Sequence, residues 1–232
     1  TKVVVKICMM YYRSLKNMKS KNIAVFGCSW TQGLQSEVFT NWVMYLSQLY
    51  PQHNFYNFAL AGTSIVYHTH LLEQVMQDKT FDVKLFQVTS PGRFTWWKPH
   101  KAKDILYQKT DNYYCLNEEY GNFVDRINMG TIYSQKFLES DRRKHKFGVE
   151  YYKRLTDEHM DLDNRAYINY IKEKVDFYFH HRRANGVPSV FTALGERKFK
   201  KYVIDDGDHF GVEGSKWQAN WIKDQLTDRN IL

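Results

Sequence analysis

Apolar runs and helix-like periodicity alternate along the first ninety residues of the chain. The runs at 23–26, 55–60 and 83–88 are short and mostly apolar, and a Gly or Pro follows each within a few residues, which predicts three buried strands. Between them, apolar residues three or four positions apart predict helices over 40–50 and 65–76. Because a helix joins each strand to the next, the order predicts a parallel sheet with helices on both faces.

This rhythm breaks after the third strand and resumes toward the C-terminus. Residues 94–160 are rich in Tyr, Trp, Lys and Asp without a clear period, and we expect an insertion that is partly helical. Beyond it, the pattern predicts a helix over 165–184, a fourth strand over 187–194 and a last helix over 213–226. The predicted fold is therefore a three-layer α/β/α sandwich with a central parallel sheet and a large insertion after the third strand.

Residues 1–17 differ from the rest and are predicted to be an N-terminal extension, followed by a single domain over 18–232. They resemble a weak signal peptide, but Lys6 interrupts the apolar run and no small-residue cleavage site follows. Met18 then opens a segment typical of a protein start. No stretch reaches the roughly 20 apolar residues of a membrane helix, so we expect a cytoplasmic protein with no membrane partner.

Composition narrows the class of protein further. Hydrophobic residues make up 43% and charged residues 25%, as in ordinary globular chains. The three cysteines, Cys8, Cys28 and Cys115, are too few and too scattered for a disulfide framework or a Cys-based zinc site. A net charge of +8 would suit a polyanion, and the run 142–146 is the candidate contact. The charge is otherwise diffuse and nucleic-acid motifs are absent, so a solvated basic surface is the preferred interpretation.

Three stretches could carry chemistry, and the first follows the first predicted strand. Gly27-Cys28-Ser29 begins a tight strand-to-helix turn that ends at Gly33. A serine in such a turn has its hydroxyl held above the sheet, and its backbone N–H can point at a developing oxyanion. A plain glycine-containing turn is the alternative. A phosphate-binding loop is disfavoured, because the glycine spacing is too long and no Lys-Ser/Thr follows.

The other two stretches follow the second predicted strand and precede the last helix. Gly62 would lie on the same rim of the sheet as Ser29, where a glycine offers an unobstructed N–H. Near the C-terminus, Asp206 stands three residues before His209 in a Gly-containing loop, so its carboxylate could orient the imidazole. An acidic turn that caps the last helix is the alternative. An EF-hand is excluded, because the alternating acidic positions and the terminal Glu are missing.

Taken together, these stretches resemble the SGNH (GDSL-type) hydrolase family. Its first motif is Gly-Asp-Ser-x-x-x-Gly, matched by Gly27-Cys28-Ser29-x-x-x-Gly33 with Cys28 in place of Asp. Its second motif centres on a glycine, matched by Gly62, and its last is Asp-x-x-His, matched by Asp206 and His209. Asp205 and Asp208 are less favoured claimants to the acidic position. The resemblance covers 22–93 and 185–227.

One motif of the family is missing. After the third strand the family has Gly-x-Asn-Asp, whose Asn completes the oxyanion hole, whereas this chain has Thr-Ser-Pro-Gly and then Arg93. Arg93 could assist the oxyanion, bind an anionic substrate group or form a structural ion pair. Trp96 and Trp97 follow closely and could line the mouth of a site, where aromatic rings stack on sugars. Packing within the insertion is the alternative for both.

The resemblance implies a serine esterase that needs neither a metal nor an organic cofactor. Ser29 would be the nucleophile, His209 its base and Asp206 the residue that orients His209, while the N–H groups of Ser29 and Gly62 would hold the oxyanion. Cys28 as nucleophile would place the reactive atom on the neighbouring side of the turn. The expected substrate is a small-molecule or glycan ester, and the aromatic insertion favours deacetylation of a carbohydrate.

A second interpretation comes from a different class of protein. The chain could be a catalytically weak or inactive SGNH scaffold that serves as a structural or binding protein, for example in a phage particle. The missing Asn, the basic surface and the unusual N-terminal segment are compatible with it. The variant motifs Gly-Cys-Ser and Thr-Ser-Pro-x-Arg resemble those of phage and bacterial members, so a virion-associated location with a protein assembly partner is the second expectation.

Overall fold

The computed structural model describes most of the core of the chain and parts of its insertion. The described residues are 19–33, 41–61, 63–77, 80–89, 96–97, 106–116, 124–125, 157–181, 187–203 and 209–232. The predicted N-terminal extension over 1–17 lies outside these residues.

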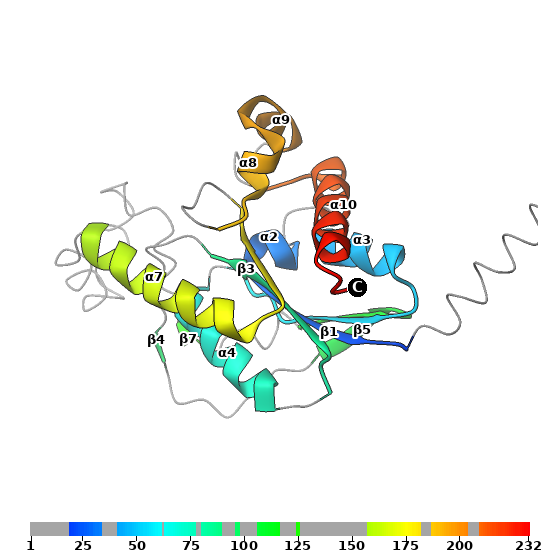
Figure 1. Cartoon of the computed structure of the whole chain (residues 1–232), viewed down its shortest axis with the longest axis horizontal. Helices are drawn as coiled ribbons and strands as arrows, with labels where there is room; N and C mark the ends of the chain where they lie inside the picture. Colours follow the sequence, from blue (N-terminus) through cyan, green and yellow to red (C-terminus); the bar gives the residue numbers. More distant parts are fainter. Residues whose placement is uncertain are drawn as a thin grey trace, which may run out of the picture.

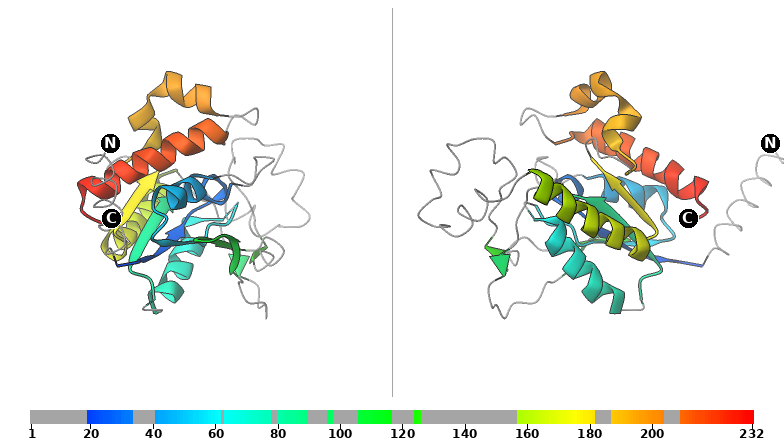
Figure 2. Two further views of the ribbon diagram at one scale, coloured as in Figure 1. Left: turned by 90° about the vertical axis from the view of Figure 1, so that its right-hand side faces the viewer. Right: turned by 60° about the vertical axis from the view of Figure 1, so that its left-hand side comes forward.

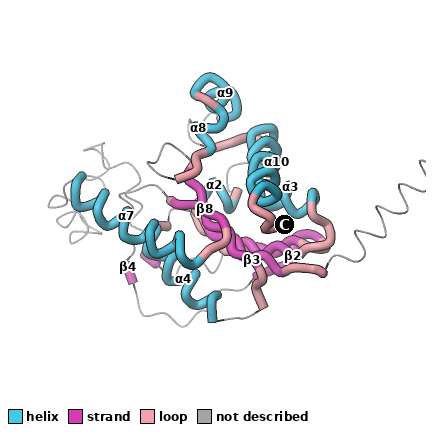
Figure 3. The backbone as a smooth tube through the Cα atoms, in the orientation of Figure 1, coloured by secondary structure: helices cyan, strands magenta, loops and turns pink. Residues whose placement is uncertain are grey.

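A six-stranded sheet forms the centre of the molecule (Figure 3). Its strand order is β5-β6-β2-β1-β3-β8, and every neighbouring pair is parallel except β5 and β6. The first three predicted strands therefore exist and lie in the order second, first, third. The strands are β1 (Asn22–Phe26), β2 (Asn54–Asn57), β3 (Val83–Val88), β5 (Leu106–Thr110), β6 (Tyr113–Leu116) and β8 (Phe177–His180).

Helices cover both faces of this sheet (Figures 1 and 2). One face carries α3 (Trp42–Leu49) and α10 (Val212–Asp228), which pack against each other, with α8 (Val190–Leu194) and α9 (Glu196–Tyr202) beside them. The other face carries α4 (Ile65–Gln77) and α7 (Asp157–Lys174). This arrangement confirms the predicted three-layer α/β/α fold.

Alternation along β1 explains why its sequence is apolar throughout. Ile23 and Val25 pack in the core beneath α3 and α10, whereas Ala24 and Phe26 pack in the core beneath α4. All four side chains are fully buried. Successive side chains of a strand point to opposite faces. A strand between two helical layers is therefore buried on both faces, and apolar residues are favoured at every position.

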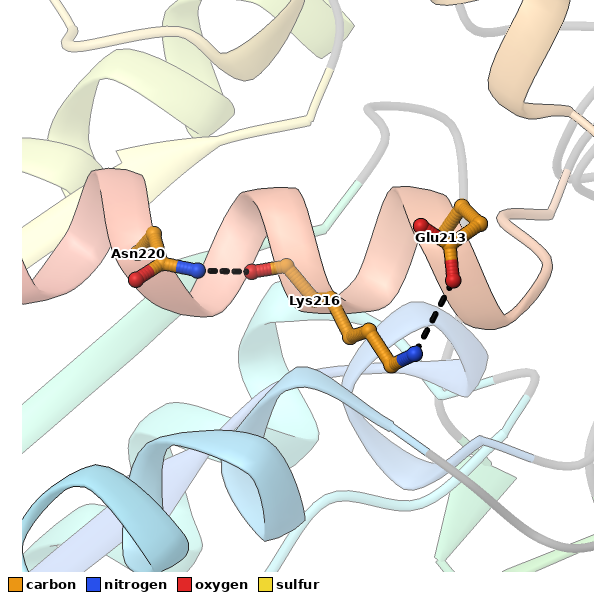
Figure 4. Close-up of polar contacts among 3 residues, drawn as sticks. All are labelled: Glu213, Lys216 and Asn220. Carbon is orange, nitrogen blue, oxygen red and sulfur yellow. Dashed lines mark hydrogen bonds and ion pairs between the residues drawn. The ribbon is translucent and has the colours of Figure 1, made fainter.

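The exposed side of α10 is polar and is stabilised by local contacts (Figure 4). The Lys216 Nζ lies 2.9 Å from the Glu213 Oε1, and this hydrogen bond raises the pKa of the Lys216 ammonium. One turn further, the Asn220 Nδ2 donates to the Lys216 carbonyl oxygen at 3.0 Å. The opposite side of the helix packs in the core through Ala219 and Ile222. The periodicity predicted over 213–226 is thus that of an amphipathic surface helix.

The predicted helix over 165–184 and strand over 187–194 are both wrong in part. The helix ends at Lys174, and β8 follows, with Phe177 and Phe179 buried in the core beneath α10. The spacing of four therefore continued past the end of the helix into a strand with its own alternation. The expected strand is mostly α8, which begins after Ser189, whose Oγ accepts a hydrogen bond from the Thr192 N–H as an N-cap.

The insertion after β3 contributes strands where it is described. A hairpin of β5 and β6 extends the sheet beyond β2, and β4 (Trp96–Trp97) pairs with β7 (Val124–Asp125) in a separate two-stranded sheet. The predicted partial helix is met within the described residues only where α7 begins at Asp157. Across the described ranges, no helix is both long enough and apolar enough to cross a membrane.

Candidate active site

Ser29 lies just beyond the carboxyl end of β1, at the point where the strand order reverses. β2 and β3 flank β1 on its two sides, and the chain turns after Phe26 into the short helix α2 (Ser29–Gln32). The helix closes at Gly33, which adopts the left-handed conformation at φ 82°. Ligands of open α/β sheets bind at such a switch point. Ser29 therefore occupies the rim on which this fold builds its sites.

The turn before Ser29 is tight enough to require a glycine. A Cβ on Gly27 would lie 2.8 Å from both the Cβ of Thr31 and the Oε1 of Gln87. The Gly27 carbonyl also accepts a hydrogen bond from the Leu60 N–H at 2.9 Å, which ties the turn to the segment after β2. The first glycine of the motif is thus explained by close packing around α2.

His209 reaches the same rim from the segment before α10. The next residue, Phe210, is buried and forms an antiparallel bridge with Val203, and the Gly211 N–H donates to the Tyr202 carbonyl at 3.0 Å. Gly214 in the first turn of α10 leaves room for Phe210, because a Cβ there would lie 2.7 Å from the Phe210 Cγ. The backbone on the C-terminal side of His209 is therefore fixed by packing and pairing.

The structure brings Ser29 and His209 into direct contact, although they are 180 residues apart in sequence. The Nε2 of His209 lies 2.6 Å from the Oγ of Ser29. Ser29 is 8% exposed, so its hydroxyl is largely shielded from water. When Nδ1 carries the ring proton, Nε2 accepts from the serine hydroxyl. A histidine nitrogen at hydrogen-bond distance from a serine oxygen can take up the serine proton, so this arrangement is able to activate a serine.

Cys28 points elsewhere. Its thiol is 2% exposed, and its Sγ lies 3.6 Å from the Nε2 of Gln87, a side chain of β3. The atom in contact with His209 is therefore the oxygen of Ser29. Of the two adjacent candidates for a nucleophile, the geometry favours the serine.

A buried polar network supports α2 from beneath. The Thr31 Oγ1 donates to the Gln87 Oε1 and accepts from the Trp42 Nε1, the latter at 3.2 Å. The Asn57 Nδ2, at the end of β2, donates to the Thr31 carbonyl at 2.8 Å. Each neighbouring strand thus supplies one amide side chain to hold the helix that carries Ser29.

The insertion also reaches this network. The Tyr113 hydroxyl of β6 accepts from the Asn57 Nδ2 at 3.0 Å and from the Asn41 Nδ2 at 2.8 Å. Asn41 in turn donates to the Gln32 carbonyl at 3.0 Å. Tyr113 is fully buried. The hairpin of the insertion is therefore connected to α2 through two asparagine amides.

The His209 imidazole contacts the indole of Trp30, which is itself packed among other aromatic rings. The Trp30 ring lies 5.2 Å from the His209 ring between centroids, and it also contacts Phe210 at 5.1 Å and Phe199 of α9 at 6.0 Å. A second histidine, His181, the residue after β8, is buried against the same Trp30 ring. The catalytic candidate His209 thus borders an aromatic cluster that continues into the core.

Several predicted site residues lie outside the described residues. These are Asp206, Gly62 and Arg93, together with the alternatives Asp205 and Asp208. Trp96 and Trp97 form β4, which is described only for its backbone pairing with β7. In the ranges that the structure describes, no group of three or more His, Cys, Asp and Glu side chains could hold a metal ion.

Sequence reasoning missed the residues that support the turn. Gln87 is a buried amide near the otherwise apolar carboxyl end of β3. Asn57 is a buried amide at the last position of β2. A polar residue at an inward position beside the carboxyl end of a buried strand is the signal that could have identified both. Trp30 and Tyr113 carry no comparable signal, because only the tertiary fold places them near His209 and Asn57.

Comparison with known proteins gives only faint structural likenesses. No protein-family model matches this chain, and no curated protein matches its sequence. The chain is similar to a solved GDSL-like lipase from Bacteroides thetaiotaomicron at 13% identity, with 95% of this chain and 97% of the lipase covered and a TM-score of 0.39. At that identity and TM-score, the likeness says nothing about the chemistry of this chain.

Proposed function

We propose that this protein is a serine ester hydrolase of the SGNH type, with Ser29 as nucleophile and His209 as base. The observation that carries the proposal is the 2.6 Å contact between the His209 Nε2 and the Ser29 Oγ at the switch point of the sheet. A histidine on a serine hydroxyl at this rim is the minimal apparatus for acyl transfer. The sequence motifs around both residues support the same family.

The proposed reaction has two halves. The Ser29 Oγ attacks the ester carbonyl while its proton moves to the His209 Nε2, and the collapsing intermediate expels the alcohol, which takes that proton. Water then attacks the acyl-serine with His209 again as base, which releases the acid and restores the hydroxyl. The N–H groups of Ser29 and Gly62 are proposed to hold the oxyanion, and Asp206 to orient the Nδ1 of His209.

The rate is expected to be modest. The chain lacks the Asn of the family's third motif, and loss of one oxyanion donor costs about 10²–10³ in rate. The proposed substrate is a small-molecule or glycan ester, with an acetylated carbohydrate favoured because the aromatic residues Trp96 and Trp97 follow β3 closely in sequence. Arg93 is proposed to bind an anionic group of the substrate or to assist the oxyanion. No metal or organic cofactor takes part in these steps.

Labelling with a fluorophosphonate probe, followed by intact mass, tests the proposal without knowledge of the substrate. The wild type is expected to gain one adduct per chain, and Ser29→Ala and His209→Ala to gain none. Cys28→Ala is the matched control, since Cys28 is adjacent but its thiol faces Gln87. Labelling should survive in that variant.

The same experiment distinguishes this proposal from the second candidate function. Folded wild-type protein that takes no label would refute the esterase proposal, and a scaffold with a structural or binding role, in a phage particle or another assembly, would then be preferred. Labelling that persists in Ser29→Ala would show that a different residue reacts. Where labelling behaves as proposed, acetylated oligosaccharides and p-nitrophenyl acetate are the first substrates to compare.

A further inference from the structure

Trp30, the residue after the proposed nucleophile, is held between the site and the core. Its indole is partly buried and contacts rings from three other parts of the chain: His181 after β8, Phe199 in α9 and Phe210 before α10. Contacts from so many elements restrict the rotamer of a side chain. The indole is therefore a fixed surface at the rim of the sheet.

The His209 imidazole lies against this fixed surface. The two ring centroids are 5.2 Å apart, and the planes are inclined by 33°, so the rings face each other more than they meet edge to face. A cation within about 6 Å of an indole centroid is attracted by the π face, and Trp is the best of the aromatic residues for this contact. In the same geometry, the Nε2 of His209 contacts the Ser29 Oγ.

We infer that Trp30 is a positioning residue for His209. It holds the imidazole in the orientation that meets Ser29, and its π face stabilises the imidazolium that forms when the serine proton is transferred. The inference rests on the proposed function for its chemical consequence. The positioning itself is a property of the resting protein and can be measured without any reaction.

The expected effect on the reaction follows from the strength of a partly desolvated cation–π contact. Removing the ring should slow the labelling of Ser29 by about 5- to 30-fold. Trp30→Phe keeps an aromatic face and should retain most of the rate, whereas Trp30→Leu keeps apolar volume and loses the face. A purely structural role would predict similar losses for Phe and Leu.

The experiment compares the wild type, Trp30→Phe, Trp30→Leu and the control Trp217→Leu. Trp217 lies in α10, is partly buried and stacks on Trp221, so its replacement removes the same ring at another place. The first readout is the second-order rate constant of fluorophosphonate labelling. The second is the ¹⁵N NMR signature of the His209 ring in the free protein, which reports the tautomer and the hydrogen bond accepted by Nε2.

Three outcomes decide the inference. A slower rate and an altered His209 signature in Trp30→Leu, with both restored in Trp30→Phe and unchanged in Trp217→Leu, would support it. A wild-type rate and an unchanged signature in Trp30→Leu would overturn it. If the folded wild type takes no label, the proposed function fails, and the NMR signature alone decides whether Trp30 positions His209.

Discussion

The Tyr113→Phe substitution tests whether the insertion supports α2, the helix that begins with the proposed nucleophile Ser29. It deletes one oxygen that accepts hydrogen bonds from the Asn41 and Asn57 amides at 2.8 and 3.0 Å. Both amides also donate to carbonyls of α2, those of Gln32 and Thr31. The substitution therefore leaves two buried N–H groups without an acceptor, at about 1–3 kcal/mol each before relaxation. We expect the free energy of unfolding to fall by about 2–4 kcal/mol.

Urea unfolding followed by circular dichroism measures this loss directly. Tyr114→Phe is the matched control. It also removes a phenolic hydroxyl, but from a partly exposed ring that stacks on Tyr56. Its free energy of unfolding should stay within about 0.5 kcal/mol of the wild type. A similarly small change in Tyr113→Phe would refute the reasoning, because the amides would then have other acceptors or would not need them. Slower labelling of Ser29 in Tyr113→Phe is the expected functional consequence.

Three further substitutions test the turn, the rim and the pH response. Gly27→Ala should abolish labelling and lower stability by about 2 kcal/mol or more, because its Cβ would lie 2.8 Å from the Thr31 Cβ; a fully labelled variant of wild-type stability would contradict the turn geometry. Thr89→Val should leave thermal stability unchanged or raise it, since the buried Thr89 hydroxyl has no hydrogen-bond partner among the residues that the structure describes. Clear destabilisation would show that the hydroxyl is bonded. Burial, and then the charge of Lys21, lower the pKa of His53 below its usual 6.5 in the folded protein. The unfolded chain therefore binds a proton at this residue more readily than the folded protein does, so the free energy of unfolding falls as pH drops below about 6.5. His53→Asn, which keeps an acceptor for the Lys21 N–H, should flatten that part of the urea-midpoint profile, and parallel profiles for the two proteins would refute the shift.

Much of the fold follows from the sequence, because short apolar runs mark its core strands and apolar residues three or four positions apart mark its core helices. β3 was predicted at its observed bounds, and α3, α4 and α10 lie within a few residues of their predictions. The failure came between 175 and 194, where Val175 and Phe179 continue a spacing of four beyond the last residue of α7. Apolar spacing alone does not distinguish the end of a helix from the start of a buried strand, and the connection at 175–176 is too short to show it.

Sequence reasoning could identify only those residues of the candidate site that belong to a recognisable local motif. Ser29 and His209 stand out because a serine between glycines and an Asp-x-x-His are recognisable patterns. The support for them is distributed over β2, β3 and β6 as single amides and one phenol, which no local pattern connects. Such contacts form only once strands distant in sequence become neighbours. The sequence therefore contains these residues but does not show which of them contact one another.

The hydrogen bonds at Tyr113 change the view of the insertion itself. A segment with no regular period, placed after the third strand, suggests an addition to a complete sandwich. Yet its hairpin continues the sheet beyond β2, and the phenol of Tyr113 is the shared acceptor of the amides of Asn41 and Asn57. Both amides also donate to carbonyls of α2, the helix that begins at Ser29. A sandwich without this hairpin would therefore hold α2 through two amides, each with one N–H group that has lost its acceptor. The insertion is thus part of what holds Ser29 in place, and a shortened chain that lacks it is expected to lose the site along with the hairpin.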